Sequence, residues 1–462
     1  MENVEKAMLE EITKNGKFDS NQIVQIKCGF SDGLTKEQIG IYANTQFSAN
    51  QMREIRLGLQ IEYSKKWIML YADPKFSPEQ MQFVREGFHR NDPIDVIRLY
   101  ANPVYDEMQM IQIQTGIYNN LTTDEIQIYA DPKYNFRQMA QIRYGLRQGL
   151  SKEQVSLFAD CDYNDIQMNQ IKDGLLEGLP IEQIKIYMDK KFDSNQMIEI
   201  RTAFQNGLSV EQVKTFAVCD YDWMQMAEIR KGFESNLQND QIRIFANPQY
   251  NNSRMKEIRL GLQNDLTIEQ VNMYTAPEFD HCQMEQIRYG FQNNLSMEQI
   301  KLYADPKFTS EQMEQIRYGL QNNLSTEKIK LYADPKFNQY QMAEIRAGFN
   351  SGLSMDQVKI YADPNILAEQ MKEYKQYITE KIPNPKEYIE VLEKYQAAGM
   401  EEEQAKIYAE AAGKGVSKNK LDLLASKNLP EDQIQFLLRN IQRNENKCKN
   451  SDTKHKHNRE GR

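Results

Sequence analysis

The sequence has few cysteines and no long apolar stretch. Five cysteines are scattered over 462 residues, too few and too far apart for a disulfide framework. No run of about 18 apolar residues occurs, and residues 1–17 carry Glu and Lys where a secretory signal has an apolar segment. We therefore expect a cytoplasmic protein with reduced thiols and no membrane contact.

Residues that commonly build active sites are also scarce. Of four histidines, only His89 and His281 precede the C-terminal tail. His281 stands beside Cys282, but we expect these two side chains to point to different faces at the start of a helix. The sequence has no paired-cysteine metal motif and no glycine-rich phosphate loop. We expect no enzymatic activity, no cofactor and no metal site.

The charge is unevenly distributed along the chain. The formal net charge is −9, although residues 443–462 hold seven Lys or Arg against three Asp or Glu. The rest of the chain is therefore strongly acidic, which opposes binding to phosphate backbones. We expect the basic tail to be disordered. It is either an electrostatic arm for nucleic acid or an acidic partner, or a solubilising end.

What the sequence does contain is a 29-residue repeat. A methionine column with a constant step of 29 consists of Met52, Met81, Met110, Met139, Met168, Met197, Met226, Met255, Met284, Met313, Met342 and Met371. Ile23 begins the column, and no insertion interrupts the register from about Phe18 to Ile378. Repeats of this length that cannot bury a core alone stack on their neighbours. We predict an all-α fold, an α-solenoid of tandem helix-turn-helix repeats.

One repeat shows where its first helix begins and ends. Ser296 followed by Gln299 forms a capping box, in which each side chain satisfies a backbone N–H of the first turn. The helix should end at Asp305-Pro306, because proline disfavours a helical residue before it. These limits predict a first helix of about 9 residues.

The second helix, of about 13 predicted residues, has stronger boundaries. Its cap position holds Asp19, Ser48, Ser77, Asp106, Asn135, Asn164, Asp193, Asp222, Asn251, Asp280, Thr309 and Asn338. Three residues after the cap position, each of these repeats has a Gln that completes a capping box. The exception is Arg254, which replaces this Gln in one repeat. We expect a left-handed residue to end the helix at Gly33, Asn91, Asn120, Gly149, Gly178, Gly207, Asn236, Asn294, Asn323 and Gly352.

A glycine also lies inside the second helix. The column comprises Gly29, Gly58, Gly87, Gly116, Gly145, Gly174, Gly232, Gly261, Gly290, Gly319 and Gly348, with Ala203 in the remaining repeat. Glycine inside a helix costs about 0.5–1 kcal/mol relative to alanine. We expect the missing side chain to admit a neighbouring helix or the tyrosine of the first helix.

A basic column follows the methionine column by four residues. It comprises Lys27, Arg56, Arg85, Arg143, Lys172, Arg201, Arg230, Arg259, Arg288, Arg317 and Arg346. Such a ladder could bind phosphates or a carboxylate-rich ligand. Because it borders the apolar stripe of the helix, we favour a structural ladder in which each arginine packs its stem and pairs its head with a neighbour. We expect the ion-pair partners of these arginines to be Asp73, Asp131, Asp305 and Asp334.

The outer face of the second helix varies most between repeats. Variable side chains on an otherwise constant repeat are typical of a surface that recognises a binding partner. A surface under no constraint would vary in the same way. The candidate partner-binding residues on this face are Tyr144, Lys231, Tyr289 and Tyr318, together with Arg288 and Arg317 of the basic column.

The repeat divides the chain into four segments. Residues 1–17 should form an N-terminal capping helix, over Val4 to Ile12, and residues 18–382 the array of about twelve repeats. After Pro383 the register breaks, and residues 383–442 should form a divergent helical cap, beginning with a helix over Lys386–Ala398. Residues 443–462 form the basic tail.

The strings Tyr-Ala-Asp-Pro-Lys-Phe and Gln-Met-x-x-Ile-Arg-x-Gly-Leu resemble helical repeats of uncharacterised proteins from anaerobic Gram-positive gut bacteria, often linked to mobile elements. The resemblance covers residues 18 to about 378 and implies no particular activity. Our leading hypothesis is a non-enzymatic scaffold that binds a protein or peptide along an extended surface. The alternative is a modular nucleic-acid binder that uses the arginine column and the basic tail, which the net charge disfavours.

Overall fold

The computed structural model describes residues 2–14, 16–380, 384–427 and 429–443. These residues form helices joined by turns, with no strand among them, and this confirms the all-α prediction. No helix in the described ranges is long and apolar enough to cross a membrane. Of the predicted tail 443–462, all but residue 443 lies outside the described residues. The chain divides into two compact units, Met1–Glu234 and Ser235–Arg462.

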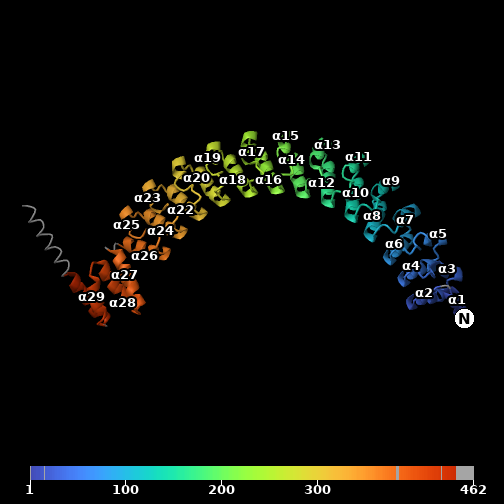
Figure 1. The fold of residues 1–462 in the computed structure, drawn as a ribbon, viewed down its shortest axis with the longest axis horizontal. Helices are drawn as coiled ribbons and strands as arrows, with labels where there is room; N and C mark the ends of the chain where they lie inside the picture. Colours follow the sequence, from blue (N-terminus) through green and yellow to red (C-terminus); the bar gives the residue numbers. More distant parts are fainter. Residues whose placement is uncertain (1, 15, 381–383, 428, 444–462) are drawn as a thin grey trace, which may run out of the picture. The chain divides into compact units, whose positions relative to one another are not determined.

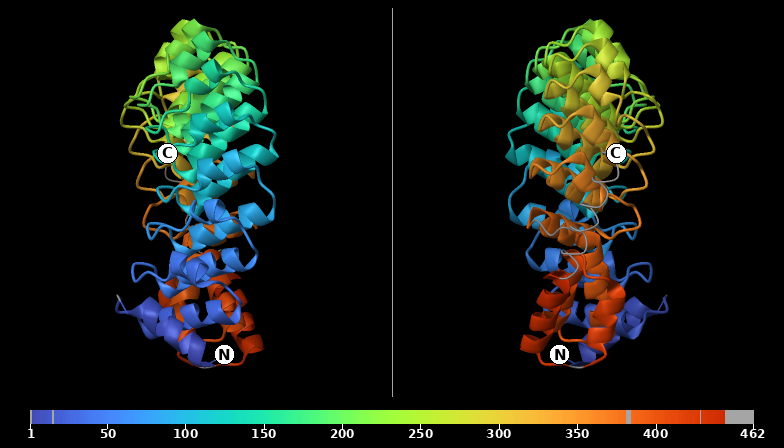
Figure 2. Two further views of the ribbon diagram at one scale, coloured as in Figure 1. Left: turned by 90° about the vertical axis from the view of Figure 1, so that its right-hand side faces the viewer. Right: turned by 90° about the vertical axis from the view of Figure 1, so that its left-hand side faces the viewer.

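In the first unit, 12-residue helices form one layer and shorter helices form a second layer (Figure 1). After α1 (Glu2–Thr13), the 12-residue helices are α2 (Ser20–Ser31), α4 (Ala49–Gln60), α6 (Pro78–His89), α8 (Glu107–Tyr118), α10 (Phe136–Arg147), α12 (Asp165–Leu176), α14 (Ser194–Gln205) and α16 (Trp223–Glu234). The shorter helices are α3 (Lys36–Tyr42), α5 (Lys65–Ile68), α7 (Ile94–Tyr100), α9 (Thr123–Tyr129), α11 (Lys152–Ser156), α13 (Ile181–Tyr187) and α15 (Val210–Lys214). Within this unit, each 12-residue helix from α2 onward packs against the next one along the chain, and Figure 2 gives two further views of these helices.

The second unit continues the same alternation and then departs from it. Its 12-residue helices are α18 (Asn252–Gln263), α20 (His281–Gln292), α22 (Ser310–Gln321), α24 (Gln339–Asn350) and α26 (Ala368–Thr379). The shorter ones are α17 (Asn239–Phe245), α19 (Ile268–Asn272), α21 (Met297–Ile300), α23 (Thr326–Tyr332) and α25 (Met355–Lys359). Beyond the array lie α27 (Pro385–Ala397), α28 (Glu402–Gly413), α29 (Lys418–Ala425) and a helix over 431–443.

The first helix of each repeat is shorter than the predicted 9 residues. The helices of this layer have 4 to 7 residues, and the chain leaves the helix before the Asp-Pro pair. In the repeat that contains α21, the N–H of Asp305 donates to the carbonyl oxygen of Tyr303, and the Asp305 carboxylate accepts from the N–H of Lys307. The aspartate therefore begins a separate turn. The second helices have 12 residues, close to the predicted 13.

The left-handed residues predicted to end the second helices all have positive φ, and Glu62 and Asp265 adopt the same conformation. In α22, the N–H of Leu324 donates to the carbonyl oxygen of Gly319 over 3.0 Å, as a left-handed cap requires. The helix predicted over Val4–Ile12 is α1, and the helix predicted over Lys386–Ala398 is α27. The predicted break at residue 383 lies outside the described residues.

The core of each unit lies between the two layers. It consists of the methionine column, the residue three positions after each Met, which is Ile except for Val84 and Tyr374, and a buried aromatic ring in or just after each short helix. The buried tyrosines are Tyr42, Tyr71, Tyr100, Tyr129, Tyr187, Tyr274, Tyr303, Tyr332 and Tyr361, and Phe158, Phe216 and Phe245 replace them in three repeats. We call these nine tyrosines the core tyrosines.

The core tyrosines explain nine of the eleven helix-interior glycines. A Cβ atom built on Gly319 would overlap the hydroxyl oxygen of Tyr332, and the same overlap recurs in each repeat with a core tyrosine. Ala203 replaces the glycine in a repeat whose ring is Phe216, which has no hydroxyl group. This confirms the predicted close approach of the first-helix tyrosine to the backbone of the second helix.

In the second helices, the glutamine of the capping box has a further role that sequence analysis did not predict. Gln312 closes the cap of α22, and its Nε2 also donates to the carbonyl oxygen of Phe337 in the next repeat over 2.6 Å. The exception, Arg254, donates instead to the carbonyl oxygens of Thr275, Ala276 and Phe279. Within each unit, such side-chain hydrogen bonds join successive repeats to the turn before the second helix.

Candidate binding surface

The arginine column lies at the contact between successive 12-residue helices. Arg288 on α20 is 4% exposed, and its Nε donates to the Glu257 carboxylate of α18 over 2.8 Å. Arg85 and Arg230 pair in the same way with Glu54 and Glu199, each 31 residues earlier in the chain. The column is therefore a ladder of bonds between neighbouring repeats, as the structural interpretation predicted.

The predicted mates of these arginines were wrong. Asp73, Asp131, Asp305 and Asp334 accept hydrogen bonds from the backbone N–H two residues later and hold the turn after the short helix. The true mates stand two residues after each methionine of the preceding repeat. Their role depends on how neighbouring helices pack, and a spacing of 31 residues does not correspond to any local motif.

Glutamine replaces glutamate at the mate position in several repeats. The Nε of Arg317 donates to Gln286 over 3.1 Å, and Arg346 donates to Gln315 over 2.9 Å. Arg317 is 6% exposed, and Glu314 on its own helix lies 3.8 Å away. Neutral amides therefore hold the guanidinium groups of Arg317 and Arg346. Carboxylates in direct contact offset little of their positive charge.

Two of the predicted tyrosines lie on this ladder. Tyr289 on α20 and Tyr318 on α22 are each 37% exposed. The guanidinium carbons of Arg288 and Arg317 lie 4.5 Å and 5.6 Å from the ring centre of Tyr289. Those of Arg317 and Arg346 lie 4.5 Å and 5.5 Å from the ring centre of Tyr318. Each exposed ring therefore contacts two buried or half-buried arginines by cation–π interactions. The structure brings together four of the six candidate residues: Arg288, Tyr289, Arg317 and Tyr318.

The other two candidates lie in the first unit. Tyr144 on α10 is 42% exposed, and the Lys172 ammonium lies 4.4 Å from its ring centre. Burial lowers the pKa of Lys172. Lys231 on α16 is exposed and forms an ion pair of 2.8 Å with Glu228 on the same helix. These two residues are separated by several repeats and share no contact, so they do not form one site.

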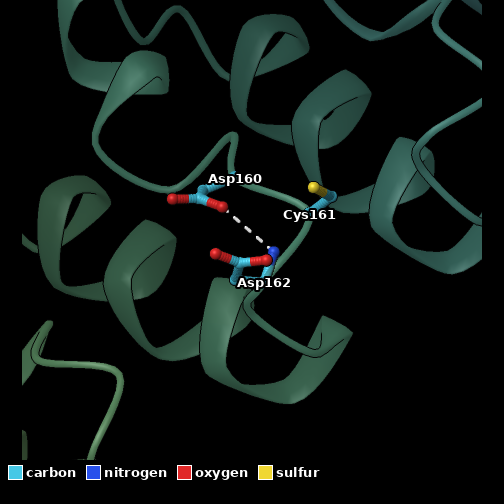
Figure 3. A group of neighbouring side chains, drawn as sticks. All are labelled: Asp160, Cys161 and Asp162. Carbon is cyan, nitrogen blue, oxygen red and sulfur yellow. Dashed lines mark hydrogen bonds between the residues drawn. The ribbon is translucent and has the colours of Figure 1, made fainter.

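A group of possible metal ligands lies in the turn between α11 and α12. Figure 3 shows the carboxylates of Asp160 and Asp162 near the Cys161 thiol, with the Asp162 N–H donating to Asp160 over 3.0 Å. Lys190 from the next repeat contacts both carboxylates, at 2.6 and 2.8 Å. Its hydrogen bond lowers the pKa of Asp160. The lysine offsets part of the negative charge of this group, which therefore has the character of a surface ion-pair cluster.

The adjacent His281 and Cys282 lie closer than expected. The Cys282 sulfur is 3.4 Å from His281 Nε2, so the expectation that they point to different faces is wrong. Burial, followed by the charge of Asp280, raises the pKa of the Cys282 thiol. A nucleophilic cysteine needs a lowered pKa, and this environment has the opposite effect.

Sequence analysis missed several exposed apolar residues on the 12-residue helices of the first unit. Met108, Tyr118, Ile166 and Leu176 lie on the face that carries polar residues in most repeats. Aligning the repeats on the methionine column and comparing the residues eight positions later would have found two of them. The candidate residues were taken from the position five residues after each methionine, which excluded these side chains.

Neither a family model, nor a curated protein, nor a solved structure matches this chain. The functional argument therefore rests on the residues and their geometry.

Proposed function

We propose that this protein is a cytoplasmic, non-enzymatic scaffold that binds a protein or peptide partner through the exposed face of its 12-residue helices. The observation that supports this most is the pair Tyr289 and Tyr318. Each ring is exposed on one face and held between two arginines on the other. Tyrosine and arginine are enriched in binding hot spots, and a ring fixed in advance loses little conformational entropy on binding.

The burial of the arginine column weighs against nucleic acid as the partner. Arg288 and Arg317 use their Nε and Nη1 groups for hydrogen bonds to neighbouring side chains. A phosphate-binding arginine has to reach the phosphate oxygens and release their counterions. Because Arg288 and Arg317 are also 4% and 6% exposed, little of each side chain is free to contact a phosphate.

Site-specific cross-linking tests this proposal. A photoreactive phenylalanine analogue is placed at position 289 or 318 of the full chain, and at position 330 as a control, where the exposed Lys330 lies on α23 in the other layer. On illumination in the native cell, we expect protein adducts of defined mass from positions 289 and 318 and none from position 330. Adducts that nuclease removes, or the same adducts from all three positions, would refute a protein-binding face.

A further inference from the structure

The outward face of α8, α10 and α12 differs from the rest of the array. We call the positions two before and eight after each methionine the two outer rows. The second row is polar in the other repeats, with Ser31, Gln60, His89, Arg147, Gln205, Glu234, Gln263, Gln292, Gln321, Asn350 and Thr379. Only Tyr118 on α8 and Leu176 on α12 are apolar, and they flank Arg147 on α10.

The first row repeats the pattern at the other end of the same helices. Met108 on α8 and Ile166 on α12 flank Arg137 on α10. Because α8 packs against α10 and α10 against α12, each row places an arginine between two large apolar residues from neighbouring helices. The pattern is therefore apolar, arginine, apolar in both rows of one three-helix surface.

The four apolar side chains are not part of the core. Their exposed fractions are 45% for Met108, 58% for Tyr118, 51% for Ile166 and 37% for Leu176. Most other repeats fold with Asn, Glu, Ser or Gln at the same positions, although the first row also holds Met224, Cys282 and Tyr340, so the repeat does not require apolar residues here. Only around α10 do apolar residues of both rows flank an arginine. A group of exposed apolar residues indicates a contact surface, because isolated ones are common but clusters are not.

The arginines of α10 provide a second, independent observation. The helix contains Arg137, Arg143 and Arg147 and no acidic residue. Among the described residues, no carboxylate oxygen lies within 4 Å of these three guanidinium groups, although the chain carries a net charge of −9. The Nε of Arg143 donates to the neutral Gln112, whereas Arg85, Arg201, Arg230 and Arg288 all contact carboxylates. Positive charge is thus concentrated, without direct neutralisation, between the two apolar edges.

From these observations, and resting on the proposed function, we propose that α8, α10 and α12 form a docking surface for an extended peptide segment of a partner protein. The segment carries an Asp or Glu opposite Arg137 or Arg147 and a large apolar residue on each side of it. Neighbouring helices lie about 8–10 Å apart, and an extended chain advances about 3.3 Å per residue. The acidic residue therefore stands about three positions from each apolar residue.

The aliphatic residues favour a peptide over a nucleic acid at this surface. Met108, Ile166 and Leu176 offer no stacking plane for a base, and the Tyr118 hydroxyl donates to the Asp92 carboxylate over 2.8 Å, which places a negative charge at the edge. A phosphate backbone would approach that charge, whereas an acidic peptide can keep its single carboxylate over α10. The position of Tyr144, one of the predicted residues, in the middle of α10 adds an exposed ring to the same surface.

The experiment selects peptides from a displayed random library of 12-residue sequences on the immobilised full chain. Enriched peptides are then titrated against three variants by fluorescence polarisation. The apolar variant combines Met108→Asn, Tyr118→Gln, Ile166→Asn and Leu176→Gln, residue types that other repeats hold at these positions. The charge variant combines Arg137→Gln and Arg147→Gln. The third variant, Tyr289→Thr with Tyr318→Thr, changes the ladder of the second unit, and circular dichroism verifies that each variant is folded.

We expect enriched peptides to contain Asp or Glu with apolar residues about three positions away. They should bind the apolar and charge variants at least tenfold more weakly, and bind less tightly as salt increases. Peptides that bind the apolar and charge variants normally but lose affinity for the Tyr289/Tyr318 variant would overturn this inference while supporting the proposed function. If no peptide is enriched, and a single-stranded oligonucleotide binds the wild type but not the charge variant, both proposals fail. Enrichment of basic peptides, or of peptides without a carboxylate, also overturns the inference.

Discussion

Gly348 in α24 faces the core tyrosine Tyr361, and this contact can be tested by changing each partner separately. A Cβ atom on Gly348 would overlap the Tyr361 hydroxyl oxygen and lie 3.2 Å from the ring carbon that bears it. The hydroxyl group is buried without a hydrogen-bond partner in the described part of the chain. Tyr361→Phe therefore removes the clashing atom without breaking a hydrogen bond.

Two opposing effects determine the outcome of Gly348→Ala. Alanine is favoured over glycine inside a helix by about 1 kcal/mol, so the substitution would stabilise α24 if the space were open. Overpacking a core typically costs about 1–3 kcal/mol, and we expect the upper end because the overlap involves a whole atom on a buried ring. The expected result is a net loss of about 2 kcal/mol for Gly348→Ala, little change or a small gain for Tyr361→Phe, and recovery to at least wild-type stability in the double variant.

Hydrogen–deuterium exchange measured by mass spectrometry suits this test, because it reports the local stability of single repeats. A loss of about 2 kcal/mol corresponds to about 30-fold lower protection in α24 and α25. The matched control is Ala203→Gly, opposite Phe216, which should lose only the helix preference of about 1 kcal/mol. If Gly348→Ala increases protection by itself, the glycine column does not exist to admit the tyrosines, and the reasoning fails.

Three further predictions concern the ladder, the capping glutamines and the core tyrosines. Arg288→Gln leaves the buried Glu257 carboxylate without its arginine and should lower the free energy of unfolding in urea by about 3 kcal/mol. Adding Glu257→Gln should restore most of this free energy. Equal losses in the single and the double variant would contradict a buried ion pair. Gln312→Ala removes two or three hydrogen bonds and should lower the free energy of unfolding by about 2 kcal/mol. Gln312→Arg, which copies Arg254, should lower it less. If the Gln312→Ala variant melts like the wild type, Gln312 does not join the two repeats. Burial raises the pKa of all nine core tyrosines above 10. Stability should therefore be constant below pH 10 and fall above it, by up to about 1.4 kcal/mol per pH unit for each tyrosine that ionises only on unfolding. Exposed tyrosines ionise first, so the last part of the rise in tyrosinate absorbance should coincide with the loss of helical circular dichroism. Ionisation of all 25 tyrosines near pH 10 with intact helices would refute the burial.

The sequence by itself determined the repeat, the helical class and most helix ends, because these depend on interactions within a few residues. Capping boxes at Thr309 and Ser296 and left-handed residues such as Asn323 are local features, and the structure places them as predicted. The glycine column also indicated a close approach, since a repeated unfavourable residue requires a structural cause. The length of the first helix was overestimated because Asp305 begins a turn by accepting from its own downstream backbone.

Only the tertiary structure decided which residues from different repeats meet. The hydrogen-bond partner of Arg288 stands 31 residues earlier in the chain, and the backbone acceptor of the capping glutamine Gln312 lies 25 residues later. Neither distance has a local signature, because each depends on the spacing and rotation of neighbouring helices. The same holds for the two outer rows: Met108, Arg137 and Ile166 stand 29 residues apart in the chain, and only the packing of α8, α10 and α12 makes them neighbours on one surface. A strict repeat determines the helical scaffold of the protein, and helix packing decides which of its variable side chains become neighbours on one surface.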